Sequence, residues 1–122
     1  MRIDEEKEKK EILNAYRGLL RSMKVERTKE DTKFIRKAFN VAVEAHKEMR
    51  RKSGEPYIFH PIAVARICAE ELGLGATSIA CALLHDTVED TDITLDDIES
   101  MFGIKCREII DGLTKLSGAF DL

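Results

Sequence analysis

The chain lacks several features that would point to other classes of protein. Its 122 residues include no tryptophan, and only two prolines and three cysteines occur. No apolar stretch is long enough for a transmembrane helix, and the N-terminal MRIDEEKEKK is not a signal peptide. Cys68, Cys81 and Cys106 lie far apart and are odd in number, which argues against a disulfide framework or a zinc ribbon. Reduced, buried thiols in a cytoplasmic protein are the expectation.

The charge balance also limits which partners the chain as a whole could attract. The formal net charge is −3, which gives no global reason to bind nucleic acid or an acidic membrane surface. Any site for an anion must therefore be local. Apolar residues make up 43% and charged residues 35%, as in an ordinary globular chain, and the length allows one domain.

The residue pattern predicts an all-α fold, a compact helical bundle. Alternation of β-branched residues is absent, and Ala, Leu, Glu, Lys and Ile dominate. Thr94 with Asp97 resembles a capping box, and Gly103 suits a helix end. Helices are expected over about 4–22, 29–50, 60–71, from 77 or 78 through the acidic run near 90, over 95–103, and over 104–116.

Two doublets, His85-Asp86 and Glu89-Asp90, follow the uncharged run Ile79–Leu84. In a continuous helix, positions four apart share one face, so each member of the first doublet would stack on one of the second. Imidazole and carboxylates at the end of a buried segment are unfavourable unless something compensates them. A divalent cation would compensate them, and a metal-centred hydrolytic site is the leading hypothesis.

His60 lies at the start of the preceding predicted helix, which a short LGLGATS turn makes an antiparallel neighbour. His60, His85 and Asp86 could then form a three-ligand site. The alternative is that His60 caps its helix and His85 is a hydrogen-bonded core residue. His46 has no acidic doublet beside it and is interpreted as packing or as support for a ligand.

Glu89 and Asp90 could orient or deprotonate a water near the cation. Alternatively they belong to an exposed acidic helix end, since further aspartates follow at 92, 96 and 97.

One local basic cluster covers residues 47–54, KEMRRKSG. Arginine pairs with phosphate and stacks on planar rings, and Ser53 and Gly54 would let a ligand approach closely. Tyr57 adds a ring and a hydroxyl. Alternatively, the cluster is attracted by the dipole at a helix C-terminus. Its closeness to His60 favours a polyanion held beside a metal.

Four motifs, HKEMRRKSGEPYIFHPIAVARI, ALLHDTVEDTDIT, FG and DGLTKLS, together resemble the hydrolase domain of the RelA/SpoT alarmone synthetases and hydrolases. These belong to the HD-domain superfamily of metal-dependent phosphohydrolases. The match runs in order over about Lys29 to Leu116. It implies an HD-type helical fold, Mn²⁺ as cofactor, and hydrolysis of guanosine 3′,5′-bis(diphosphate) (ppGpp) or its pentaphosphate relative (pppGpp) to GDP or GTP with release of the 3′-pyrophosphate.

Carried over residue by residue, the resemblance implies that His60, His85 and Asp86 ligate the metal. Glu89 and Asp90 would be the catalytic acidic pair that acts on the attacking water.

The substrate-binding residues implied by the resemblance are Arg51, Lys52 and Ser53, with Tyr57 nearby. The substrate would be ppGpp or pppGpp, and the RKSGEPYI segment argues against another nucleotide.

The family's fourth metal ligand, an aspartate of a later helix, cannot be placed before Leu122. We therefore expect residues 1–122 to be the N-terminal part of the hydrolase domain, with weak metal binding and little activity alone. A synthetase domain and regulatory regions would belong to the longer protein, the synthetase being a partner of this domain; no membrane or nucleic-acid partner is expected, and the oligomeric state stays open. The alternative is a non-catalytic regulatory or dimerisation module attached to a synthetase.

Overall fold

The computed structural model describes residues 4–120, and their side chains as far as residue 116. Over this range the chain folds into α-helices joined by short connections, and its only β pairing is an isolated bridge between Arg50 and Pro56. The all-α prediction is confirmed. The helices are α1 (Glu5–Ser22), α2 (Lys29–Ala45), α3 (Phe59–Glu70), α4 (Ala76–Leu84), α5 (Thr87–Asp90), α6 (Leu95–Phe102) and α7 (Ile104–Phe120).

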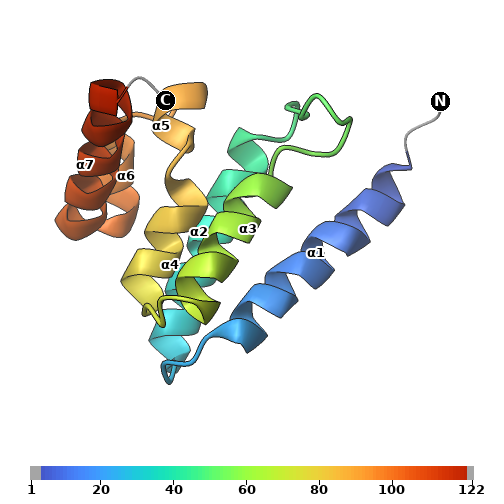
Figure 1. The fold of residues 1–122 in the computed structure, drawn as a ribbon, viewed down its shortest axis with the longest axis horizontal. Coiled ribbons are helices and arrows are strands. Elements are labelled where there is room, and N and C mark those ends of the chain that lie inside the picture. The colour runs from blue at the N-terminus through green and yellow to red at the C-terminus, as the bar shows by residue number, and fades with distance from the viewer. Residues whose placement is uncertain (1–3, 121–122) are drawn as a thin grey trace.

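Helix α4 lies at the centre of the bundle. It contacts α2, α3 and α7, while α1 covers α3 and α6 packs on α7 (Figure 1). Every side chain from Ile79 to Leu84 is buried, as expected for a run without a charge. Because other helices pack against α4 on several sides, the position of the residues at its C-terminal end is fixed.

Aromatic and sulfur contacts join α1 to α2 and α4 to α7. Tyr16 of α1 stacks on Phe39 of α2 with ring centroids 4.1 Å apart. Cys81 of α4 and Cys106 of α7 are buried free thiols with their Sγ atoms 3.2 Å apart, and Cys68 is a partly buried free thiol. Cys81 and Cys106 are buried as predicted, whereas Cys68 is only partly buried.

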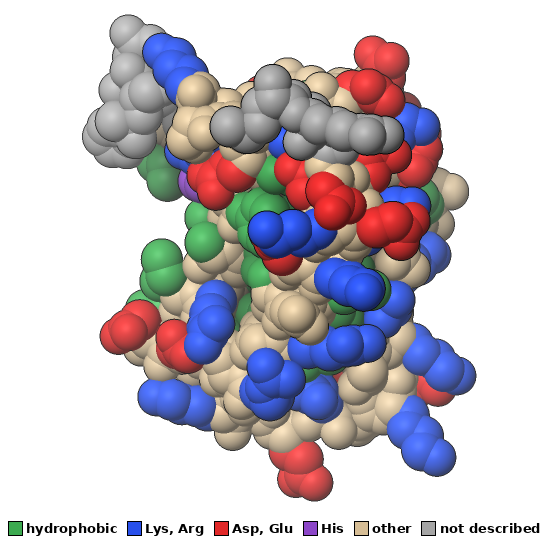
Figure 2. Space-filling view, turned by 90° about the vertical axis from the view of Figure 1, so that its right-hand side faces the viewer, with side chains coloured by type: hydrophobic (Ala, Val, Ile, Leu, Met, Phe, Trp, Pro, Cys, Tyr) green, Lys and Arg blue, Asp and Glu red, His purple; other side chains and the backbone are tan. Residues whose placement is uncertain are grey.

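The exposed side of α1 is charged, as its Lys and Glu content predicts. Figure 2 shows acidic side chains gathered in the upper part of this face and Lys and Arg spread over the lower part. The first turn of α1 contains Glu5, Glu6 and Glu8, and its last turn contains Arg21. This order of charges is favourable with respect to the helix dipole. No helix of residues 4–120 has both the length and the apolarity that a membrane crossing requires.

The predicted capping box at the start of α6 is confirmed. The Thr94 side chain accepts from the Asp97 backbone N–H at 3.1 Å, and the Asp97 carboxylate accepts from the Thr94 N–H at 3.0 Å. Gly103 ends the helix with a φ of 95°, a conformation that glycine adopts without strain.

Replacing Thr94 with alanine should lower the free energy of unfolding by about 1 kcal/mol, because one N-terminal N–H of α6 loses its acceptor. Chemical denaturation of the purified chain measures the change. Thr77→Ala is the matched control, because Thr77 is exposed on α4 and has no side-chain hydrogen bond among the described residues. Equal effects of the two substitutions would contradict the capping argument.

Helix α2 is shorter than predicted. The sequence pattern extends it to Arg50, whereas it ends at Ala45 with His46 as the C-cap. The backbone then reverses: the Tyr57 N–H donates to the Met49 carbonyl at 2.9 Å, which closes a hairpin-like loop. Gly54 at a φ of 94° makes the reversal possible.

The doublets His85-Asp86 and Glu89-Asp90 do not share one continuous helix, contrary to the prediction. Helix α4 ends at Leu84, and His85 and Asp86 form the junction with α5. The Thr87 hydroxyl donates to the Leu84 carbonyl at 2.8 Å, and His85 Nδ1 lies 2.6 Å from the Ala82 carbonyl. Side chains here satisfy carbonyls at the end of α4, so the backbone is free to change direction.

Candidate metal centre

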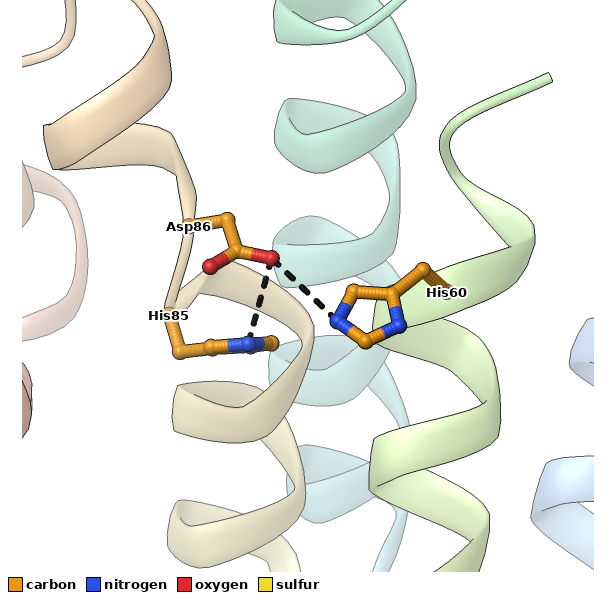
Figure 3. Close-up of side chains that lie close together, drawn as sticks. All are labelled: His60, His85 and Asp86. Carbon is orange, nitrogen blue, oxygen red and sulfur yellow. Dashed lines mark ion pairs between the residues drawn. The ribbon is translucent and has the colours of Figure 1, made fainter. Parts of the chain in front are cut away.

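His60, His85 and Asp86 converge at one point of the bundle (Figure 3). His60 comes from the first turn of α3, and the other two from the α4–α5 junction. His85 Nε2 lies 3.2 Å and His60 Nε2 3.7 Å from Asp86 Oδ2. One ligand atom from each residue lies within 4.8 Å of the others. The structure thus brings together the three residues that the sequence nominated as ligands.

The orientation of His85 suits a ligand. Its Nδ1 faces the Ala82 carbonyl, which can only accept, so the proton belongs on Nδ1. Nε2 of the neutral ring then carries a lone pair directed at the cluster, the arrangement typical of metal-binding histidines.

His60 does not cap its helix. The N-cap of α3 is Ile58, and no side-chain hydrogen bond caps this helix. Burial lowers the pKa of His60, and the nearby charge of Arg51 lowers it further, while Asp86 acts in the opposite direction. A neutral imidazole, the form that binds cations, is favoured.

Tyr57 is tied to the acidic side of the cluster. Its hydroxyl donates to Asp86 Oδ2 at 2.8 Å and lies 3.4 Å from Asp90 Oδ2. Burial, together with these two carboxylates, raises the pKa of Tyr57. This contact of Tyr57 with two carboxylates was missed from the sequence, because only the reversal of the chain after α2 turns the ring toward α5.

The buried ring of His46 packs against the ring of Tyr57. The His46 ring is 2% exposed, its Nδ1 lies 3.0 Å from the Ala42 carbonyl, and its centroid lies 4.9 Å from that of Tyr57. Within the described part of the chain, its Nε2 has no hydrogen-bond partner. The geometry agrees with the packing or supporting role that the sequence indicates.

The two residues of the second doublet, Glu89 and Asp90, differ in their contacts. The Asp90 N–H donates to the Asp86 carbonyl at 2.9 Å, so these residues stay one turn apart as predicted. Asp90 is exposed beside Tyr57. Glu89 is also exposed and does not belong to the cluster of possible ligands.

The predicted nucleotide-binding residues Arg51, Lys52 and Ser53 are exposed on the loop before α3. Ser53 donates to the Glu55 carboxylate at 3.2 Å, and Arg51 Nε lies 4.0 Å from it. The positive charge of Arg51 helps to lower the pKa of His60.

The helical fold and the three convergent side chains point to one protein family. Residues 38–121 match the model of the HD domain, and the chain belongs to this family, whose domains are metal-dependent. Its relatives include proteins named for (p)ppGpp hydrolysis or synthesis, as the resemblance implied. The chain is 48% identical over 82 residues to the guanosine-3′,5′-bis(diphosphate) 3′-pyrophosphohydrolase of Vibrio cholerae, covering 67% of this chain and 12% of that protein.

Two further relatives extend the comparison. The bifunctional (p)ppGpp synthase/hydrolase SpoT of Escherichia coli is 48% identical over 84 residues, 69% of this chain and 12% of its own length. A protein of Mycobacterium leprae, named for GTP pyrophosphokinase activity, is 48% identical over 88 residues, 72% of this chain and 11% of its own length. The chain spans about a tenth of the length of the curated relatives it matches.

Proposed function

We propose that this chain is the metal-binding part of a hydrolase domain that removes the 3′-pyrophosphate of ppGpp or pppGpp, giving GDP or GTP. The observation that carries the proposal is the convergence of His60, His85 and Asp86. It occurs in a chain that is 48% identical over 82 residues to a protein named for this reaction.

Mn²⁺ is the proposed cofactor. Two imidazoles and one carboxylate form a donor set that suits a first-row divalent cation, and the three donor atoms already lie within 4.8 Å of one another. When bound, the cation would offset negative charge on phosphate and lower the pKa of water.

The chain's own residues would handle protons and orientation. We propose that Asp90, with Glu89, accepts a proton from the attacking water. Tyr57 would hold Asp86 in place, because its hydroxyl already donates to that carboxylate.

Arg51, Lys52 and Ser53 are proposed to bind the guanine nucleotide, the guanidinium and ammonium through phosphate or ring contacts. Their exposure, and the effect of the Arg51 charge on the pKa of His60, support this assignment. Tyr57 would border the same site through its ring. A synthetase domain as partner, and a cytoplasmic location, belong to the same proposal.

The test is Mn²⁺-dependent release of pyrophosphate from ppGpp. It should be measured on this chain and on a chimaera in which residues 1–116 replace the matching part of the Vibrio cholerae enzyme. We expect turnover by the chimaera that chelation of Mn²⁺ stops, and little turnover by the chain alone. A chimaera that binds Mn²⁺ and nucleotide but releases no pyrophosphate would refute the hydrolase and favour a regulatory module.

A further inference from the structure

Arg50 joins α1 to the loop that precedes α3. Its Nη1 and Nη2 donate to the Glu8 carboxylate at 2.9 and 2.7 Å, and Nη1 also donates to the Gly54 carbonyl at 2.7 Å. This bidentate pair lowers the pKa of Glu8. Arg50 is therefore already engaged by a bidentate ion pair and a carbonyl within the protein, whereas, among the described residues, the side chain of Arg51 has only a 4.0 Å contact with Glu55.

The loop itself, residues 50–56, has little apolar support. Backbone bonds close it internally, from the Arg51 N–H to the Glu55 carbonyl and from the Gly54 N–H to the Arg51 carbonyl. All side chains from Arg51 to Glu55 are exposed. Its position relative to the bundle must come from contacts at its ends.

Close packing does not hold α1 against the base of this loop. A cavity of about 270 Å³ lies there, and its walls include Ile12, His46 and Pro56 together with both members of the ion pair. In Figure 1 the N-terminal half of α1 diverges from α3 toward the loop. The Glu8–Arg50 pair bridges this gap.

We infer that Arg50 is a positioning residue for the proposed nucleotide site: through Glu8, α1 fixes the loop that presents Arg51, Lys52 and Ser53. The inference rests on the proposed function. Since the HD match begins at residue 38, α1 adds a contact that the matched region by itself lacks. Nucleotide affinity should depend on α1, whereas metal binding should not.

The first experiment needs no activity and uses this chain. In Glu8→Gln, the amide hydrogens of Arg51 and Gly54 should exchange with solvent about two- to fivefold faster by NMR, as expected for a partly exposed ion pair. Arg50→Ala should have a larger effect, because the Gly54 bond is lost as well. Glu11→Gln, the same change one turn later on α1, is the control. The reversed pair, Glu8→Arg with Arg50→Glu, should exchange more slowly than Arg50→Ala, because the ion pair returns, but faster than wild type, because a carboxylate at position 50 cannot donate to the Gly54 carbonyl.

The second experiment links the loop to the substrate. In the chimaera, Glu8→Gln should raise KM for ppGpp several-fold and leave kcat and Mn²⁺ affinity unchanged, and the reversed pair should give a lower KM than Arg50→Ala. Wild-type exchange rates in both single variants would overturn the inference, as would faster exchange with an unchanged KM. An inactive parent chimaera would refute the proposed function, while the exchange data would still decide whether α1 fixes the loop.

Discussion

Replacing His85 with alanine should abolish Mn²⁺-dependent hydrolysis in the chimaera and weaken Mn²⁺ binding by more than about 100-fold, since loss of outer-sphere partners alone costs 10–100-fold. In the parent, His85 Nε2 and Asp86 Oδ2 lie 3.2 Å apart and offer a cation two adjacent donors. The substitution removes one of these donors. Asp86→Asn should give the same result. Titration with Mn²⁺ followed by paramagnetic resonance measures the affinity.

Asp92→Asn is the control for this prediction. It removes one negative charge from the same acidic run, but Asp92 is exposed and outside the cluster of possible ligands. Its Mn²⁺ affinity should stay close to that of the parent. Retained hydrolysis in folded His85→Ala and Asp86→Asn variants would refute the ligand assignment.

Removing the hydroxyl of Tyr57 has the second largest expected effect. Tyr57→Phe should lower Mn²⁺ affinity by about 10–100-fold, because Asp86 would lose the donor that orients it. The ring would keep its contact with His46, so the fold should be retained. Mn²⁺ titration of the variant chain and pyrophosphate release by the chimaera measure the two consequences.

Tyr16→Phe is a matched control, since the Tyr16 hydroxyl is buried without a hydrogen-bond partner among the described residues. It removes the same atom far from the cluster and should leave Mn²⁺ affinity unchanged. If Tyr57→Phe kept its Mn²⁺ affinity and only raised KM for ppGpp, Tyr57 would contact the substrate and would not orient Asp86.

The helices were predictable because their apolar spacing and end residues act locally. The Thr94–Asp97 box and the uncharged α4 segment needed no knowledge of distant residues. The break at His85 was not predictable, because it depends on side-chain bonds to carbonyls that compete with the helix.

The sequence predicted which residues make up the candidate site, but it did not predict the side-chain contacts around them. The three proposed ligands follow from two neighbouring helices and a short turn. The contact of Tyr57 with Asp86 spans 29 residues, and that of Arg50 with Glu8 spans 42. Such contacts depend on how the chain reverses after α2, and no local pattern encodes that path.

The proposed ligands are divided between α3 and the α4–α5 junction, so a cation bound there would cross-link two segments of the chain. An ion held only by the folded form would stabilise that form by mass action, by about 2.7 kcal/mol at a free concentration 100 times its dissociation constant. Supply of metal would then set the lifetime of the fold as well as the rate of its chemistry. A shortage of the ion would then lower the stability of the domain as well as its proposed activity.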